Sequence, residues 1–377
     1  MEYLTRELRK RLDARVYCFG ASREAPEVAA TFGNWEALAG AEPHRAALRT
    51  LAVNLQMVAA LEGSQLVHTH TWYANFAGHL AKLDYGIPHV MTSHSLEPLR
   101  PWKEEQLGGG YRISSFVERT AALDADRIIA VSSGMRADIL DAYPEVDPKR
   151  VVVIYNGIDT REYAPTNTPG ILARYGLDEK KPVAIFVGRI TRQKGVVHLL
   201  DAVEHFHPDV QLLLCAGAPD TPEIAEEMRV RVTALQAKRP GIVWISEMLP
   251  RAETVRLLAA STVFVCPSIY EPFGIVNVEA MGTGTAVVAS AVGGIPEIVV
   301  EGETGRLVHF AKNKTGTPDD PAQFARDFAA AVNDVATDAQ KAHRMGEAGR
   351  ARALEKFSWE TIAEETVALY QSLVGGA

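Results

Sequence analysis

The chain has 377 residues, of which 47% are hydrophobic and 23% charged, which is enough for two globular domains with their own cores. Its formal net charge of -8 argues against nucleic acid as a partner, because binding to a phosphate backbone needs a basic face. No apolar run reaches the roughly 18 residues of a membrane-spanning helix, so we expect no stable membrane insertion. Three cysteines, Cys18, Cys215 and Cys266, lie far apart in or beside apolar runs. With no signal peptide visible, they predict buried thiols in a cytoplasmic protein.

The chain opens with a helical pattern that places Tyr3, Leu4, Leu8 and Leu12 on one side, and residues 15–19 then predict a strand. A doubly wound domain normally begins with a strand and a glycine-rich turn ahead of its first helix. Neither precedes this helix. We therefore expect either that the sequence begins late or that the domain is built without its usual first strand.

Short apolar runs alternate with amphipathic helical stretches along most of the chain, which predicts parallel sheets covered by helices on both faces. Two series of strands indicate two doubly wound, Rossmann-like domains. Thr, Asn, Pro and Gly cluster over residues 156–170, where we place the boundary. The expected strands cover residues 66–68, 88–91, 127–131, 151–154, 183–187, 210–215, 243–245, 263–265 and 286–289.

Histidines and aromatic residues gather in the first series, around His68, His70, Trp72, Tyr73 and His94. A metal site is not expected, because His68 and His70 alternate on a strand and lack cysteine or carboxylate partners at ligand spacing. His94 lies just past a strand, where a substrate-contacting residue belongs. A hydrogen-bonded structural histidine is the alternative.

The segment from Arg100 to Arg112 contains three consecutive glycines and many hydrogen-bond donors, including Lys103 and Tyr111. We expect a mobile loop. It either holds an anionic acceptor or is only a surface loop.

Two motifs resemble ligand sites but occur at the wrong place. Asp124-Ala125-Asp126 is a DxD triplet of the kind that binds a metal-diphosphate, yet it precedes a strand instead of following one. Gly282-Thr283-Gly284 follows a helix and precedes a strand, the reverse of a dinucleotide fingerprint.

In the second series, the first strand leads into Gly188-Arg189-Ile190-Thr191-Arg192-Gln193-Lys194-Gly195. Arg189 is suited to grip a phosphate bidentately, and Lys194 adds a point charge. Ligands in open parallel sheets bind at the carboxyl ends of strands, so we favour phosphate binding over ordinary solvated residues.

The most informative segment is Glu271-Pro272-Phe273-Gly274-Ile275-Val276-Asn277-Val278-Glu279, which follows the apolar run ending at Pro267. It predicts a strand end, a loop with a carboxylate, and a helix that begins at a glycine. Free backbone N–H groups at a helix start bind anions, and carboxylates accept hydrogen bonds from sugar hydroxyls. Gly293-Gly294, after the next strand, allows close backbone approach to a ligand or marks a plain helix entry.

These elements, together with Asn156-Gly157-Ile158-Asp159, resemble the retaining glycosyltransferases of the GT-B fold, family 4, over nearly the whole chain. That fold has two Rossmann-like domains with a cleft between them. The stretches 68–73, 93–103 and 106–114 resemble the actinobacterial-type glycogen synthases, also described as α-maltose-1-phosphate synthases. Members of that group carry a first strand and a glycine-rich loop before the helix that opens this chain, and both are missing from it.

The resemblance implies domains of residues 1–159 with the C-terminal helix 358–377 for the acceptor, and residues 160–357 for the nucleotide sugar. It implies an α-1,4-glucosyltransferase that uses ADP-glucose, without metal or cofactor, and extends glucose 1-phosphate or an α-1,4-glucan in glycogen biosynthesis. The catalytic residues implied are His94, Arg189, Lys194 and Glu271. Donor binding is implied for Gly188, Arg189, Lys194, Glu271, Phe273, Gly274, Ile275 and Glu279, and acceptor binding for Trp72, Tyr73, Lys103, Tyr111 and Arg112.

Other functions stay open at this point. The same fold also suits transfer to a lipid or small alcohol, nucleotide-sugar binding without turnover, or sugar-nucleotide epimerisation. A homodimer is possible.

Overall fold

The computed structural model describes residues 2–40, 42–100, 102–217 and 219–375. The chain divides into two compact units, one made of Met1–Asn156 and Trp359–Ala377 and the other of Gly157–Ser358. Each unit has a parallel sheet with helices on both faces, so the predicted α/β class is confirmed.

The sheet of the first unit has the strand order β3-β4-β5-β6, and a separate parallel pair, β1-β2, packs against its helices through Tyr17 and Phe32. Strand β4 is buried along its whole length because helices cover both faces of the sheet. The strands are β1 (Val16–Phe19), β2 (Val28–Phe32), β3 (Val67–His70), β4 (His89–Ser93), β5 (Arg127–Ala130) and β6 (Val151–Val153).

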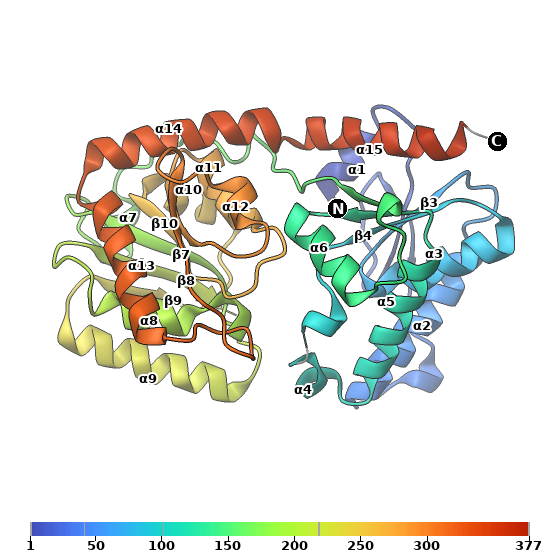
Figure 1. Cartoon of the computed structure of the whole chain (residues 1–377), viewed down its shortest axis with the longest axis horizontal. Coiled ribbons are helices and arrows are strands. Elements are labelled where there is room, and N and C mark those ends of the chain that lie inside the picture. Colours follow the sequence, from blue (N-terminus) through green and yellow to red (C-terminus); the bar gives the residue numbers. More distant parts are fainter. Residues whose placement is uncertain (1, 41, 101, 218, 376–377) are drawn as a thin grey trace. The chain divides into compact units, whose positions relative to one another are not determined.

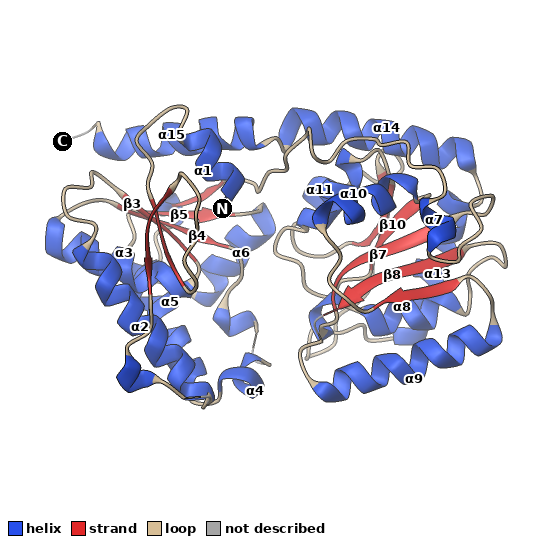
Figure 2. Ribbon diagram, turned by 180° about the vertical axis from the view of Figure 1, so that it is seen from behind, coloured by secondary structure: helices blue, strands red, loops and turns tan. Residues whose placement is uncertain are grey.

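Three long helices, α2, α3 and α5, pack together on one face of this sheet (Figures 1 and 2). On the other face, α1 lies beside α15, and Leu4, Leu8 and Ile362 share a core with Val90 and Ile129 of the sheet. The helices are α1 (Glu2–Leu8), α2 (Pro43–Ala59), α3 (Trp72–Tyr85), α4 (Lys103–Leu107), α5 (Gly110–Asp124), α6 (Ser133–Ala142) and α15 (Trp359–Val374), with short 3-10 turns η1 (Glu36–Leu38), η2 (Glu97–Leu99) and η3 (Pro148–Arg150).

The second unit has a six-stranded parallel sheet in the order β12-β11-β10-β7-β8-β9. Its large apolar core lies under α8, α9 and α13, while α10 and α11 pack on the other face and α14 lies against α11 (Figure 2). The strands are β7 (Val183–Arg189), β8 (Gln211–Gly217), β9 (Ile242–Ile245), β10 (Val263–Cys266), β11 (Ala286–Ser290) and β12 (Gly305–Val308). The helices are α7 (Ile171–Arg174), η4 (Arg192–Lys194), α8 (Val196–Val203), α9 (Pro222–Lys238), α10 (Arg251–Ala260), α11 (Ile275–Gly282), α12 (Ile295–Ile298), α13 (Pro321–Ala336) and α14 (Ala339–Lys356).

All the strands expected from the sequence are present, and β2 and β12 are additional. The expectation of a mobile loop over residues 100–112 is wrong, because α4 and the first turn of α5 occupy most of that segment. Gly108, at φ 51°, ends α4, so this glycine makes a sharp break between two helices. Pro101 lies outside the described residues. Within the part of the chain that the structure describes, no helix is long and apolar enough to cross a membrane.

Candidate functional site

The residues predicted to bind the donor meet at the carboxyl end of the sheet in the second unit. In that sheet β10 lies between β7 and β11. The loops that follow these three parallel strands are therefore neighbours, although β7 and β11 are about a hundred residues apart in the chain.

Lys194 and Glu271 form the centre of this site. Lys194 Nζ lies 2.6 Å from Glu271 Oε2, and the Ser268 hydroxyl donates to the same oxygen at 3.1 Å. The other carboxylate oxygen, Oε1, receives no hydrogen bond from the described residues. Burial opposes the charge on Lys194, but the Glu271 carboxylate outweighs it and raises the pKa of Lys194. Glu271 is thus held by one oxygen, with the other left to accept from a ligand hydroxyl.

The backbone around Glu271 is held from both sides by glycines. A Cβ at Gly195 would meet the carbonyl oxygen of Pro267 at 2.0 Å, and one at Gly293 would meet that of Glu271 at 1.9 Å. Gly294 N–H also donates to the Glu271 carbonyl at 3.0 Å. The close approach that Gly293-Gly294 permits is therefore to the Glu271 backbone, which neither interpretation of this pair in the sequence included.

Arg189 is the last residue of β7, directly after Gly188, and its side chain is largely exposed. One guanidinium nitrogen, Nη2, lies 2.5 Å from Asp220 Oδ1. Asp220 follows β8, the neighbouring strand, and fixes the direction of the guanidinium. The remaining N–H groups of Arg189 have no acceptor among the described residues, so an anion can bind there while the ion pair persists.

The helix α11 begins at Ile275, with Gly274 as its N-cap at φ 103°. This φ is one that L side chains rarely adopt, so any other residue at Gly274 would be strained. Because the N–H groups of Gly274 and Ile275 stand ahead of the first intrahelical hydrogen bond, they are available to an anion. Phe273 is buried and packs edge-on against Phe357 at 5.9 Å, which anchors the loop.

Glu279 lies one turn into α11, as the sequence predicted. Its Oε1 accepts a hydrogen bond from the Tyr163 hydroxyl at 2.8 Å. Burial raises the pKa of Glu279 to about 7, although the Tyr163 hydrogen bond and Arg251 act in the opposite direction. Near neutral pH this carboxyl is therefore present in both protonation states.

In the first unit, His94 follows β4 and His70 ends β3, and the two rings are joined by a hydrogen bond of 3.0 Å between His70 Nδ1 and His94 Nε2. Burial lowers the pKa of His94 to about 4, so its imidazole is neutral at pH 7.

The five residues predicted to bind the acceptor do not share one environment. Trp72 is buried and stacks on Tyr73, whose side chain is exposed. Lys103 is buried in an ion pair of 2.9 Å with Glu97, and Tyr111 donates to the Glu97 carbonyl at 2.6 Å. Arg112 is exposed.

Lys103 and Tyr111 therefore hold the segment after β4 in place in this structure. Burial lowers the pKa of Lys103, and Glu97 compensates only in part. Of the five, Tyr73 and Arg112 present accessible surface to a ligand.

Several partners of the site residues were not predicted from the sequence. Ser268 stands three positions before Glu271 in the same loop, and Asp220 follows a predicted strand, so both had a usable signal. Tyr163 had none, because it lies in an irregular segment far from Glu279 in the chain. Glu118 of α5 was also not predicted; it is a buried carboxyl whose Oε1 accepts from the Tyr143 hydroxyl and from the Glu97 N–H.

The two discarded motifs have structural roles. Asp126 accepts from the backbone N–H of His89 at 2.8 Å and pairs with Lys82, so it fixes the start of β4. Gly282 is the last residue of α11, and Thr283-Gly284 lead on to β11, so the triplet follows a helix and precedes a strand as predicted. Across the described residues, no group of three or more His, Cys, Asp or Glu side chains is arranged to hold a metal ion.

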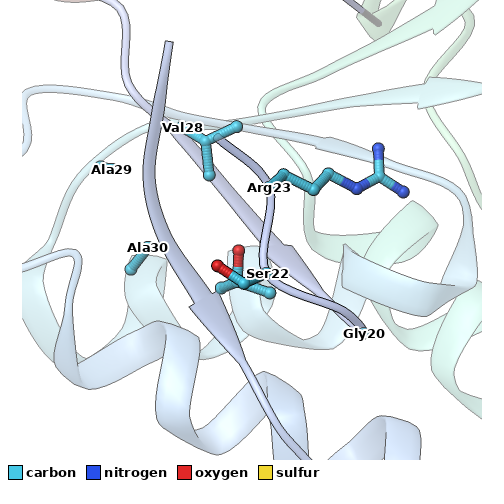
Figure 3. A pocket seen from close by; sticks show the side chains of 7 residues that line it. Gly20, Ser22, Arg23, Val28, Ala29 and Ala30 are labelled. Atoms are coloured by element: carbon cyan, nitrogen blue, oxygen red, sulfur yellow. The ribbon is translucent and has the colours of Figure 1, made fainter. Parts of the chain in front are cut away.

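A hollow of about 330 Å³ beside the β1-β2 pair contains none of the predicted site residues (Figure 3). Gly20, Ser22 and Arg23, after β1, line it together with residues of β2. The Arg23 side chain extends away from Ala30 (Figure 3).

Comparison with known proteins agrees with this arrangement. A sequence model described as Glycosyltransferase Family 4 matches residues 1–162, and one described as Glycosyl transferases group 1 matches residues 169–352. The chain is 54% identical, over 98% of its length and 93% of the relative's, to the alpha-maltose-1-phosphate synthase of Mycolicibacterium smegmatis. The corresponding protein of Mycobacterium tuberculosis is also 54% identical, over 87% of this chain and 84% of the relative. A D-inositol 3-phosphate glycosyltransferase of Mycobacteroides abscessus is 30% identical over 81% of this chain and 65% of the relative.

Among solved structures, sucrose-phosphate synthase from Thermosynechococcus elongatus superposes with a TM-score of 0.80 at 25% identity, covering 99% of this chain and 92% of that one. HepE from Anabaena, solved with UDP and glucose, superposes with a TM-score of 0.71 at 25% identity, covering 91% and 86%. The chain therefore belongs to the family 4 glycosyltransferases of the GT-B fold, and it is a glycosyltransferase that groups with the α-maltose-1-phosphate synthases.

Proposed function

We propose that the protein transfers glucose from ADP-glucose to the 4-hydroxyl of glucose 1-phosphate, which yields α-maltose 1-phosphate, or to the end of an α-1,4-glucan. The observation that carries this choice is the 54% identity, over nearly the full length of both chains, to a relative named alpha-maltose-1-phosphate synthase. The site at Lys194 and Glu271 supplies the matching chemistry, a cation for a phosphate and a carboxylate oxygen for a sugar hydroxyl.

The contacts of the second unit support the proposed donor binding. Arg189 and Lys194 bind the diphosphate, with the N–H groups at the start of α11 as additional donors. Glu271 accepts from donor sugar hydroxyls through Oε1, because Oε2 is taken by Lys194 and Ser268. Glu279 accepts from the ribose hydroxyls.

The proposed reaction proceeds with retention at the anomeric carbon. The bond between C1 and the diphosphate oxygen breaks, and a bond from C1 to the acceptor oxygen forms on the same face. The acceptor proton passes to the leaving diphosphate, so the protein supplies no general base. Lys194 stays protonated beside Glu271 and stabilises the charge that develops on the diphosphate. In this proposal neither a metal nor a cofactor takes part.

His94 contacts the transferred sugar from the first unit. Arg112, the exposed cation among the predicted acceptor residues, binds the phosphate of glucose 1-phosphate, and Tyr73 offers a ring face to the acceptor sugar. The surface formed by Tyr73 and Arg112 is held in place by the less exposed residues of the predicted set, Trp72, Lys103 and Tyr111. We place this activity in cytoplasmic α-glucan biosynthesis.

The test is ADP release from ADP-glucose in parallel reactions with glucose 1-phosphate, with glycogen and with no acceptor. We expect release that depends on glucose 1-phosphate and is accompanied by a product of maltose 1-phosphate mass. Release that requires inositol 3-phosphate or lipid vesicles instead would support the other acceptor classes. Release without any acceptor would indicate hydrolysis or epimerisation and would refute the proposal.

A further inference from the structure

Three histidine rings form a row in the first unit: His68 and His70 lie on β3, and His94 follows β4. The centroids of His68 and His70 are 4.3 Å apart, and those of His70 and His94 are 5.3 Å apart. Burial lowers the pKa of His68 to about 3, of His70 well below its ordinary value and of His94 to about 4. All three rings are therefore neutral at physiological pH. Each carries one N–H, on either Nδ1 or Nε2, and the hydrogen bonds of the ring determine which nitrogen holds the proton.

The bond between His70 Nδ1 and His94 Nε2, at 3.0 Å, has two possible directions. If His94 donated, the His70 proton would sit on Nε2, which is buried and has no hydrogen-bond partner. A buried N–H without an acceptor is rarer and less favourable than a nitrogen lone pair without a donor. Geometry therefore favours a proton on His70 Nδ1, which donates to the bare Nε2 of His94.

This direction determines what His94 offers to a ligand. With Nε2 accepting from His70, the His94 proton lies on Nδ1. That atom has no partner among the described residues, and His94 is only partly buried. His94 then faces a ligand as a hydrogen-bond donor and not as an acceptor, which suits an oxygen of the transferred sugar.

The far end of the stack is fixed by the C-terminal helix. His68 Nδ1 lies 2.5 Å from the Tyr370 hydroxyl on α15, and His68 Nε2 lies 2.7 Å from Thr92 Oγ1 on β4. The residue after His70, Thr71, has φ 64°, the one positive φ of a non-glycine residue among those described. Such a conformation is unfavourable for a β-branched residue and persists only where its surroundings hold it.

We propose that His70 is a positioning residue, which fixes the ring of His94 with its proton on Nδ1, and that Tyr370 and His68 brace His70 from behind. The inference rests on the proposed contact between His94 and the transferred sugar. It adds three residues, His70, His68 and Tyr370, to those that support transfer, and Tyr370 lies on the last helix of the chain.

Two substitutions separate hydrogen bonding from ring packing. His70→Phe keeps a stacked ring but removes the donor, whereas His70→Asn places an amide N–H where Nδ1 stood. We expect His70→Phe to lower kcat by about 10- to 100-fold with little change in the KM for donor, and His70→Asn to recover most of that loss. Tyr370→Phe should give a smaller decrease in kcat.

The matched control is His198→Phe, since His198 is a histidine of the second unit whose ring packs on Phe324 and whose Nδ1 is buried without a partner. It should change neither kcat nor the His94 ring. Thermal unfolding of each variant shows whether the fold is retained.

The tautomer is measured independently of activity, by the ¹⁵N shifts of labelled histidine with the His94 signals assigned through His94→Gln. We expect a protonated Nδ1 in the native protein and in His70→Asn, and a mixture of tautomers in His70→Phe. A native His94 protonated on Nε2 would overturn the inference, as would full kcat in a folded His70→Phe. If the shifts are as expected but His94→Gln retains full activity, the tautomer stands and the proposed sugar contact of His94 fails.

Discussion

The substitution Gly293→Ala tests whether the position of the Glu271 backbone governs transfer. Gly293 has φ 54°, and a Cβ there would lie 1.9 Å from the Glu271 carbonyl oxygen, whereas real Cβ contacts are essentially never below 3.0 Å. Both atoms belong to backbone, so no flexible side-chain end can move aside. The Glu271 loop has to shift by about an ångström. This shift also lengthens the hydrogen bond that the Gly294 N–H donates to the Glu271 carbonyl.

Two effects of this substitution have different magnitudes. An alanine in the left-handed region costs about 1–2 kcal/mol wherever it occurs. For a unit of this size, each kcal/mol lowers Tm by about 2–4 °C. The second effect is on the rate: displacing the Glu271 carboxylate by about 1 Å should reduce the rate of transfer by about 100-fold.

Gly302→Ala is the matched control, because Gly302 has φ 76° in the same unit but a Cβ added there would meet no atom within 4 Å. We expect both variants to lose a few degrees in Tm, with the larger loss in Gly293→Ala, and only Gly293→Ala to lose kcat for ADP release. Equal kcat and equal Tm in the two variants would show that the loop accommodates the methyl group. The close approach of Gly293 to the Glu271 backbone would then not govern transfer.

Three further predictions concern charge and metal. Burial raises the pKa of Glu279 to about 7, so the folded state holds this proton more tightly than the unfolded chain, and the stabilisation present at low pH is lost as pH rises through about 7. In Glu279→Gln the decrease in Tm between pH 5 and 8 should be smaller than in the native protein; an unchanged decrease would assign it to other groups. Lys103→Met should lower the free energy of unfolding in urea by about 3–5 kcal/mol, because it leaves the Glu97 carboxylate buried without its partner, and adding Glu97→Gln should restore part of it. If Lys103→Met instead raised the KM for the acceptor and left stability unchanged, Lys103 would be an acceptor-binding residue after all. Incubation with EDTA should leave ADP release unchanged, and activity restored only by added divalent metal would contradict the proposed metal-free mechanism.

The strands and the loops of the candidate site could be predicted from the sequence because both depend on local patterns. Apolar runs gave the strands, and the residues that follow them, such as Arg189 and Glu271, fall at strand ends in the structure. The segment after Arg100 was mispredicted because three glycines indicate flexibility only when nothing buries the residues beside them, and here Lys103 is buried.

The partners of the site residues could not be predicted in the same way. Lys194 meets Glu271, and Tyr163 meets Glu279, because of the order in which strands join the sheet and the path of an irregular segment. No local pattern encodes either. The same holds for Tyr370, whose contact with His68 spans most of the chain.

The order of strands explains why this carboxylate is held so closely. Because β10 lies between β7 and β11, the loop after β10 has a neighbouring loop on each side, and each neighbour approaches its backbone at a glycine. Gly195 contacts the start of the loop at Pro267, and Gly293 contacts it at Glu271. Glu271 is thereby fixed through its backbone, while Lys194 and Ser268 fix its side chain through one oxygen. A carboxylate oriented before the donor arrives needs little reorganisation when the donor binds, and in the proposed mechanism this preorganisation is the contribution that the fold of the second unit makes to transfer.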